Sequence, residues 1–259
     1  MTTLTYNNME MMVAVAARQL ENNTCVIVGT GVPVAAAMLA QKTHAPDLLI
    51  FFEAGGAGPL LPTMPISVGD SRTTHKALLA STMLDIMESA QRGMVDYTFL
   101  GGAEIDKYGN LNSTMIGDNY AKPKVRFPGS GGANDLGSLC RRILVVTPHV
   151  KRRFVEKVTF LTTPGYLSGP GAREEAGLPS GTGPYRVVTD LAILDYEPTS
   201  KRMRILSLHP GVTVEQVKEN TGFELLVHPE IQKTHAPTHD ELKLLREVID
   251  PMGYIIGRT

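Results

Sequence analysis

Short apolar runs alternate with amphipathic stretches along the N-terminal part of the chain. Residues 9–20 (MEMMVAVAARQL) are apolar with polar residues at helical intervals, which predicts a helix. Residues 24–28 form a β-branched run that predicts a strand, and the Ala-rich residues 34–41, preceded by Pro33, predict a second helix. The apolar residues 48–52 predict another strand. A strand, a helix and a strand within about 30 residues form a βαβ unit, so the two strands are expected to run parallel.

A similar order recurs further along the chain. Residues 75–93 have a helix-like pattern, and residues 97–100 and 143–147 are expected to be strands. The apolar side of that helix would be formed by Leu78, Leu79, Met83, Ile86 and Met87. Residues 59–72 contain three prolines and no periodicity, which predicts an ordered surface loop that could act as a wall or a lid.

The C-terminal half has more β character. The glycine-rich and proline-rich residues 165–183 are expected to form a long loop or a connector. The segments 185–189, 192–196 and 203–208 predict a hairpin region at the edge of the sheet. Thr238 and Glu241 have the spacing of a capping box, which predicts the start of a last helix.

These patterns predict an α/β protein with an open, mainly parallel sheet flanked by helices and with a β-hairpin region in the C-terminal half. The chain has 259 residues, and it contains no repeat and no composition change that marks a boundary. We therefore expect a single domain spanning residues 1–259.

Composition narrows the possible partners. The formal net charge of −1 gives no electrostatic sign of nucleic acid or of an anionic membrane surface as a partner. No apolar run reaches the roughly 20 residues that span a bilayer, and residues 1–12 lack the pattern of a leader. A cytoplasmic protein is expected. Cys25 and Cys140 are predicted to be reduced structural thiols without a catalytic role.

Glu53 is the first candidate for chemistry, because it follows the apolar run 48–52 directly and is followed by Ala54 and two glycines. Ligands of open α/β sheets bind beyond the carboxyl ends of the strands, and small residues after Glu53 would let a substrate approach. The alternative is that Glu53 caps a turn or pairs with a lysine.

Known motifs exclude several other kinds of site. The chain contains no HExxH, no CxxC pair, no EF-hand loop and no GxSxG elbow, so no metal site is expected. Residues 28–32 (VGTGV) hold a GxG after a strand but lack the further residues of a dinucleotide or triphosphate site. A strand-end carboxylate and two glycine-rich turns remain, and such a set suits covalent acyl transfer by a carboxylate nucleophile.

A succession of motifs along nearly the whole chain resembles family I coenzyme A transferases, and is most similar to the β subunits of the glutaconate type. The motifs are residues 28–33 (VGTGVP), 45–47 (APD), 53–55 (EAG), 67–70 (SVGD), 101–112 (GGAEIDKYGNLN), 129–134 (GSGGAN) and 220–223 (NTGF). The resemblance implies an open α/β β subunit that pairs with a homologous α subunit in a heterotetramer or a larger complex. The active site would lie at the interface of the two subunits.

The resemblance also implies roles for particular residues. Glu53 matches the glutamate that attacks an acyl-CoA and then carries coenzyme A (CoA) as a glutamyl thioester. Gly31 matches a turn that meets the external acyl oxygen, and Gly131, Gly132 and Ala133 match a loop whose amides face the thioester. Asn134 is a possible further site residue at the start of the helix after the loop, or simply the N-cap of that helix.

The implied function is transfer of CoA between an acyl-CoA and a (di)carboxylate by a ping-pong route, with a glutaconate-type substrate favoured. No tightly bound cofactor is expected, since CoA is both substrate and covalent intermediate. Related β-like subunits have a replaced or shifted nucleophile and belong to decarboxylases or to hydrolases that open a cyclic β-keto acyl-CoA. Glu53 favours the transferase over these alternatives. A non-catalytic CoA-binding subunit is the alternative from another class.

Overall fold

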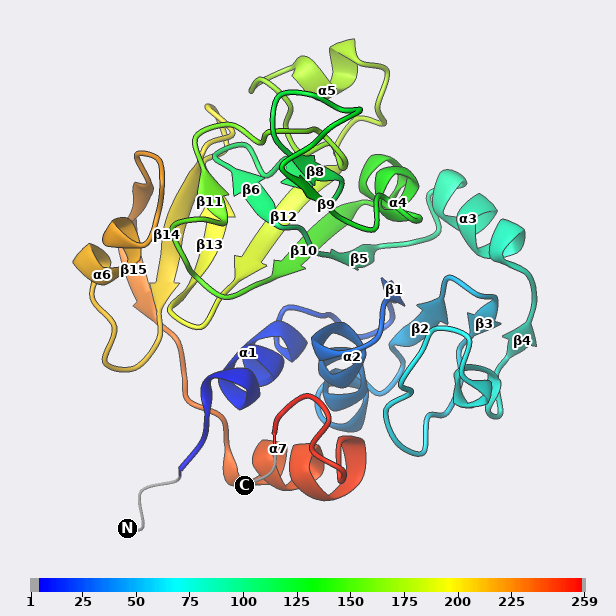
Figure 1. The fold of residues 1–259 in the computed structure, drawn as a ribbon. Coiled ribbons are helices and arrows are strands. Elements are labelled where there is room, and N and C mark those ends of the chain that lie inside the picture. Colours follow the sequence, from blue (N-terminus) through cyan, green and yellow to red (C-terminus); the bar gives the residue numbers. More distant parts are fainter. Residues whose placement is uncertain (1–4, 258–259) are drawn as a thin grey trace. The chain divides into compact units, whose positions relative to one another are not determined.

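The computed structural model describes residues 5–257, which form two compact units (Figure 1). Unit 1 contains the described residues up to Phe99 and from His235 onward, and unit 2 contains Leu100–Thr234. The single domain expected for residues 1–259 stays a prediction. Part of the segment 1–12, where no leader was expected, lies outside the described residues. Within residues 5–257, no helix combines the length and the apolar character that a membrane span requires.

The sheet of unit 1 contains two strands that consist of apolar residues, Cys25–Val28 and Leu49–Phe52. Its order is β5-β1-β2-β3-β4, with β5 at Tyr97–Leu100, β1 at Cys25–Val28, β2 at Leu49–Phe52, β3 at Gly56–Ala57 and β4 at Leu79–Ala80. Strand β1 is parallel to both β2 and β5, while β3 and β4 add antiparallel pairs. Every residue of β1 is buried, which explains its uninterrupted apolar sequence.

Helices α1 (Asn8–Ala17), α2 (Val32–Lys42) and α7 (His239–Leu244) pack together within unit 1 (Figure 1). A π-helical stretch, η2 (Leu245–Ile249), continues α7. The capping box predicted for Thr238 and Glu241 is confirmed. The last element of the chain therefore returns to the first helices.

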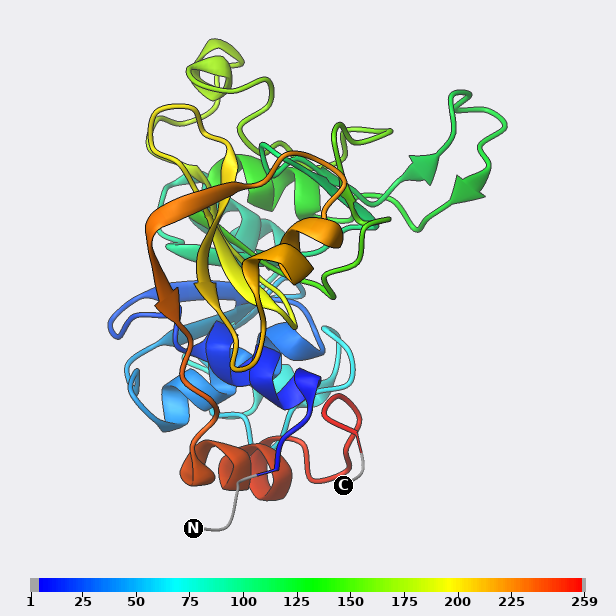
Figure 2. The same ribbon diagram turned by 90° about the vertical axis from the view of Figure 1, so that its left-hand side faces the viewer.

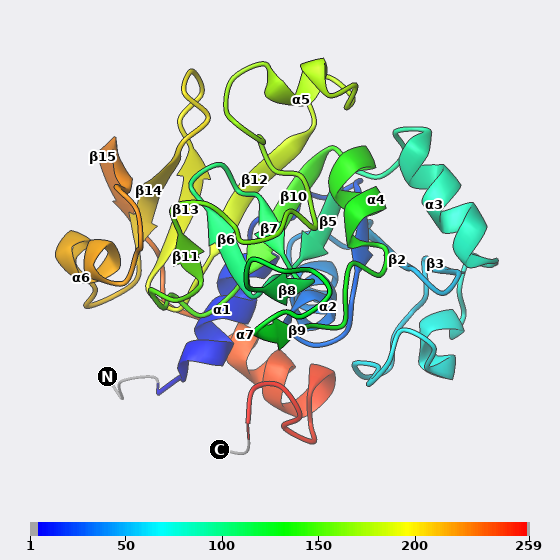
Figure 3. The same ribbon diagram turned by 45° about the horizontal axis from the view of Figure 1, so that its top comes forward.

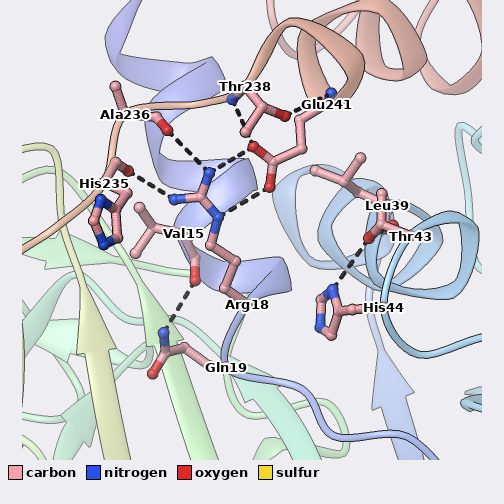
Figure 4. Close-up of polar contacts among 10 residues, drawn as sticks. All are labelled: Val15, Arg18, Gln19, Leu39, Thr43, His44, His235, Ala236, Thr238 and Glu241. Atoms are coloured by element: carbon pink, nitrogen blue, oxygen red, sulfur yellow. Dashed lines mark hydrogen bonds and ion pairs between the residues drawn. The ribbon is translucent and has the colours of Figure 1, made fainter.

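Arg18, which follows α1, joins that helix to the C-terminal segment (Figure 4). Its Nε and Nη2 donate to the two carboxylate oxygens of Glu241 at 2.9 and 2.5 Å. Its guanidinium also donates to the carbonyl oxygens of His235 and Ala236 at 2.7 and 3.0 Å. Burial raises the pKa of the Glu241 carboxyl, but the hydrogen bonds from Arg18 and Thr238 outweigh burial and hold that pKa below its ordinary value.

The helix predicted over residues 75–93 is wrong in its first half. Leu79–Ala80 instead form β4 and pair with β3, and helix α3 begins only at Met83 and ends at Gln91. Thr82 stops the helix from extending backwards, because its hydroxyl accepts from the Asp85 amide in a capping box. The predicted apolar side is largely exposed, and among the residues of α3 only Ile86 and Ala90 are buried. The predicted loop 59–72 has no helix or strand until a 3₁₀ turn, η1 (Ser71–Thr74).

The main sheet of unit 2 runs in the order β15-β14-β13-β12-β10 (Figure 3). These strands are β10 (Arg142–Val146), β12 (Gly183–Val188), β13 (Ala192–Tyr196), β14 (Met203–Leu208) and β15 (Leu226–Lys233). The predicted hairpin region is confirmed, since β12, β13 and β14 pair antiparallel. It does not form the edge, because β15 pairs parallel to β14 outside it. Strand β15 contains Pro229, which breaks the strand pattern of its sequence. The pairing of β15 with β14 also includes a register shift.

Smaller elements of unit 2 surround this sheet. They are β6 (Glu104–Asp106), β7 (Leu111–Asn112), β8 (Met115–Ile116), β9 (Val125–Arg126), β11 (Phe154–Val155), α4 (Ala133–Leu139), α5 (Ala172–Glu175) and α6 (Val214–Glu219). One core joins the side chains of the main sheet to those of β6, β7 and β11, including Ile105, Leu111 and Phe154. The predicted α/β class, with an open, mainly parallel sheet and a C-terminal hairpin region, is confirmed.

We expect Arg18→Ala to lower the free energy of unfolding by about 1–2 kcal/mol, since it leaves the partly buried Glu241 without its cation. The pKa of Glu241 is lower in the folded state than its ordinary value of 4.5. The difference in free energy of unfolding between wild type and variant should therefore be largest above pH 4.5 and should shrink as the pH falls through the folded-state pKa. Equilibrium urea denaturation between pH 3 and 8 measures the difference.

Arg92→Ala is the matched control, because Arg92 and Glu88 form an exposed ion pair with 3.8 Å between their charged atoms. That substitution should change the free energy of unfolding by less than about 0.5 kcal/mol. Equal losses in the two variants would show that the Arg18 contacts stabilise the folded state no more than an exposed ion pair does.

Candidate active site

Glu53 lies at the carboxyl end of β2, in the turn that leads into β3. The backbone amide of Gly55 donates to the carbonyl oxygen of Phe52 at 2.9 Å, which closes a four-residue turn with Glu53 and Ala54 at its centre. Strand β2 is parallel to β1, and Phe52 lies opposite Val28. The residues that follow the two strands, Glu53 and the Gly29–Gly31 turn, are therefore at the same edge of the unit 1 sheet.

The glycines after Glu53 fix this turn against neighbouring backbone. Gly55 has φ +121°, and a Cβ built on it would lie 2.2 Å from the carbonyl oxygen of Ser81. A Cβ on Gly56 would lie 2.0 Å from the carbonyl oxygen of Thr73. The Ser81 amide and hydroxyl both donate to the carbonyl oxygen of Gly55, at 2.9 and 3.0 Å. Only glycine fits at these two positions, and the close packing limits movement of the strand end.

The Glu53 side chain is half-buried and has no hydrogen bond or ion pair with any of residues 5–257. The alternative interpretation gave it a turn to cap or a lysine to pair with, and neither contact exists in the described part of the chain. The turn is closed by main-chain atoms instead. A carboxylate placed at a strand end without an internal partner is available to a ligand.

Gly31 forms the start of α2 on the same sheet edge. It has φ +87°, a conformation that favours glycine, and its carbonyl oxygen accepts from the Ala35 amide at 3.2 Å. No side chain caps the helix, and Pro33 lies in its first turn. The nearest atom to a Cβ on Gly31 would be Cδ1 of Ile255, 3.7 Å away. The uncapped amide end of α2 thus remains free to face an oxygen that carries negative charge.

Gly131 and Gly132 end the loop between β9 and α4, and Ala133 and Asn134 are the first two residues of α4, all within unit 2. Gly131 has φ +50°, and a Cβ on it would meet no atom within 4 Å. Helix α4 begins at Ala133 with Gly132 as its N-cap. The prediction of Asn134 as an N-cap is wrong, since Asn134 lies within the first turn and its Nδ2 donates to the carbonyl oxygen of Thr162 at 3.0 Å. The loop is exposed or half-exposed, which leaves it accessible to a ligand.

A buried polar scaffold supports this loop, and none of its residues was a sequence-based candidate. Asn112 is fully buried, and its Nδ2 donates to Glu104 and to the carbonyl oxygen of Met115 at 2.7 Å each. The Thr159 amide and hydroxyl donate to the Glu104 carboxylate at 2.8 and 2.9 Å. Next along the chain, Ser113 exchanges hydrogen bonds with Gly129 at 3.1 and 3.0 Å.

Asp106 and Asn110 form the second half of the same scaffold. Asn110 donates to the Asp106 carboxylate at 2.9 Å, and its side-chain oxygen accepts from the amides of Gly165 and Leu167 at 2.8 and 3.1 Å. Burial raises the pKa of Asp106, and its hydrogen bonds partly offset that effect. The spacing of acidic and amide residues in 104–112 (EIDKYGNLN) is the signal that could have revealed this scaffold.

Other titrating groups with shifted pKa values have structural surroundings. Burial lowers the pKa of His149 to about 4, and its ring nitrogens contact the hydroxyls of Thr189 and Thr221. Burial raises the pKa of the Cys140 thiol to about 12, so this thiol stays neutral, and Cys25 is also buried and is not part of a disulfide. Among residues 5–257, no group of His, Cys, Asp and Glu side chains has the arrangement of a metal site.

Comparisons with known proteins place the chain among enzymes that act on CoA. Residues 9–220 match the protein family described as coenzyme A transferase. The chain is similar to the B-type subunit of 3-oxoadipate CoA-transferase from Pseudomonas knackmussii, with 41% identity over 93% of this chain and 92% of that protein. It is also similar to the B-type subunit of glutaconate CoA-transferase from Acidaminococcus fermentans, with 41% identity over 95% of this chain and 93% of that protein. The crystal structure of glutaconate coenzyme A-transferase from Acidaminococcus fermentans matches with a TM-score of 0.92 at 39% identity, over 98% of each chain.

The glycine constraint beside Glu53 predicts an uneven response to added methyl groups. Gly55→Ala should lower the free energy of unfolding by about 3 kcal/mol or more, because the new methyl group meets backbone at a positive φ. Gly29→Ala should change it by less than about 1 kcal/mol, since a Cβ there meets no atom within 4 Å. Urea denaturation of both variants measures this contrast, and similar losses would contradict the constraint at Gly55.

Proposed function

The chain belongs to the coenzyme A transferase family, and on that premise we propose that Glu53 is the covalent nucleophile of a CoA transfer reaction. The chain is the B-type subunit of a heteromeric CoA-transferase. The observation that carries the proposal for Glu53 is its position, since this half-buried carboxylate has no polar partner in residues 5–257 and shares a sheet edge with the uncapped start of α2.

In the proposed reaction, the Glu53 carboxylate attacks the carbonyl carbon of an acyl-CoA thioester. The carbon–sulfur bond breaks, which leaves an acyl-glutamyl anhydride and CoA thiolate. The thiolate then attacks the glutamyl carbonyl of the anhydride and expels the first carboxylate, so that CoA is held as a glutamyl thioester. A second carboxylate repeats these two steps in reverse, takes up CoA and restores Glu53.

Backbone amides would stabilise the oxyanions formed in these steps. We assign to the Gly31 turn the external acyl oxygen, and support comes from the uncapped helix end and the adjacent strand position of this turn. We assign to Gly131, Gly132 and Ala133 the oxygen of the glutamyl thioester, on the strength of the family resemblance and of their exposed or half-exposed position at the start of α4. Asn134 is a proposed further contact of this loop.

We propose dicarboxylates and their CoA esters as substrates, with glutaconate-type compounds favoured. The support is chemical, since the two relatives named above act on glutaconate and on 3-oxoadipate, which are both dicarboxylates. Because those relatives are each one of two kinds of subunit, we also propose a homologous α subunit as partner, in a heterotetramer or a larger complex, and expect it to contribute to the substrate site.

We expect the Glu53-containing peptide to gain the mass of CoA less one water molecule when the co-expressed pair of subunits is incubated with an acyl-CoA and no acceptor. The mass difference follows from the glutamyl thioester, and mass spectrometry of a proteolytic digest measures it. Glu53→Gln should abolish the label and lower CoA transfer by at least about 10³-fold, because an amide is not a nucleophile here.

Glu88→Gln, on the exposed face of α3, is the matched control and should keep both the label and the transfer rate. If the wild-type peptide stays unlabelled while CoA is released in a water-dependent reaction, the enzyme is a hydrolase and not a transferase. Release of carbon dioxide from the acyl group without acceptor would indicate a decarboxylase. Bound acyl-CoA without any turnover would indicate a non-catalytic subunit.

A further inference from the structure

An open cleft of about 460 Å³ lies beside the glycine loop of unit 2. Its lining includes Ser130 of the loop and Asn134 at the start of α4, together with the aromatic residues Tyr120 and Phe160. Its volume is in the range of small-molecule sites. The cleft is open to solvent, so a ligand can lie in it without being enclosed.

An aromatic pair forms one wall of this cleft. The rings of Tyr120 and Phe160 have centroids 5.8 Å apart and are inclined by 36°, and Tyr120 is 60% exposed. The Arg126 guanidinium lies 4.4 Å from the centroid of the Tyr120 ring and also donates to the carbonyl oxygen of Tyr120. Arg126 thus holds Tyr120 in place, and exposed aromatic faces of this kind bind nucleobases by stacking.

Polar groups in the cleft remain available to a ligand. The hydroxyls of Thr114 and Thr162 bond to each other at 2.8 Å, and the Asn134 amide group donates to the Thr162 carbonyl oxygen at 3.0 Å. In contrast, neither the Ser130 hydroxyl nor the Asn134 side-chain oxygen has a hydrogen-bond partner among the described residues. The lining therefore includes an amide oxygen and a hydroxyl that no other protein group in the described part of the chain occupies.

The charge of the hairpin that contributes Tyr120 to the cleft favours an anion. Strands β8 and β9 form a hairpin that extends from the body of unit 2 (Figure 2). Its tip carries the exposed Lys122 and Lys124, and Arg126 lies on β9. Asp118 on the hairpin and Asp135 beside Asn134 are the opposing charges, while no residue that lines the cleft is acidic. Lysine and arginine side chains recognise phosphate groups.

We propose that this cleft binds the nucleotide end of CoA, with adenine stacked on the Tyr120–Phe160 pair and the phosphate groups near Lys122 and Lys124. The proposal rests on the proposed function and adds the place where this chain holds the non-reacting end of the substrate. Binding energy from such a remote group increases the rate at the reacting thioester, because it positions the acyl group at the nucleophile.

The test uses the assembled enzyme and two substrates that share one acyl group, an acyl-CoA and the corresponding acyl-pantetheine, which lacks the nucleotide. The double variant Lys122→Ala/Lys124→Ala should lower kcat/KM for the acyl-CoA by about tenfold and leave the value for acyl-pantetheine unchanged. Adenosine 3′,5′-bisphosphate should inhibit the wild-type enzyme competitively with acyl-CoA, and its inhibition constant should rise by a similar factor in the variant.

Lys218→Ala/Lys233→Ala removes the same charge from exposed positions on α6 and β15 and is the matched control, expected to behave as wild type. Equal losses with both substrates, or no loss with acyl-CoA, would overturn the proposal. Loss of the assembled complex in size-exclusion chromatography would also overturn it, and would identify the hairpin as a contact for the second kind of subunit instead. The CoA label on Glu53 should persist in the lysine double variant. A wild-type enzyme without this label would therefore contradict the proposed reaction and not the proposed role of the cleft.

Discussion

The candidate active site depends on the parallel pairing of β1 and β2. Their register sets Val28 opposite Phe52, so the next residues of both strands, the Gly29–Gly31 turn and Glu53, emerge at one sheet edge. A slip by one residue would turn the side chains of β2 to the opposite face of the sheet and change the direction of the strand end. The apolar residues of β1 and β2 prevent this slip, because both strands bury side chains in the core of unit 1.

Close packing then converts this placement into a rigid turn. Gly55 and Gly56 bring the backbone of Ser81 and Thr73 too near for any side chain, and the turn that holds Glu53 is closed by main-chain hydrogen bonds. The carboxylate consequently has no structural task among the described residues. A nucleophile must be held in position while its reacting atom stays free, and both conditions agree with the role that we propose for Glu53.

Unit 2 reaches a comparable result with buried polar side chains. Glu104 on β6 bonds to Thr159, and Asn112 on β7 bonds to Met115. Asn110, just before β7, bonds to Gly165. Ser113 bonds to Gly129 and extends this support to the glycine loop. Each buried amide or carboxylate in the scaffold has its hydrogen bonds satisfied, which makes the arrangement specific. The glycine loop and the neighbouring cleft can therefore be exposed and still well positioned.

The sequence by itself determined the α/β class, the βαβ unit around Glu53 and the capped last helix, because hydrophobic periodicity and turn chemistry act over short distances. It failed at residues 75–82 and at β15, where pairing with β3 and with β14 decides the structure rather than local propensity. Only the tertiary structure showed that Glu53 has no partner in residues 5–257, that Asn134 lies within α4, and that Asn112 supports the glycine loop. The physical reason is that a free side chain, a cleft or a scaffold is defined by atoms distant in the sequence, whose approach no local pattern encodes.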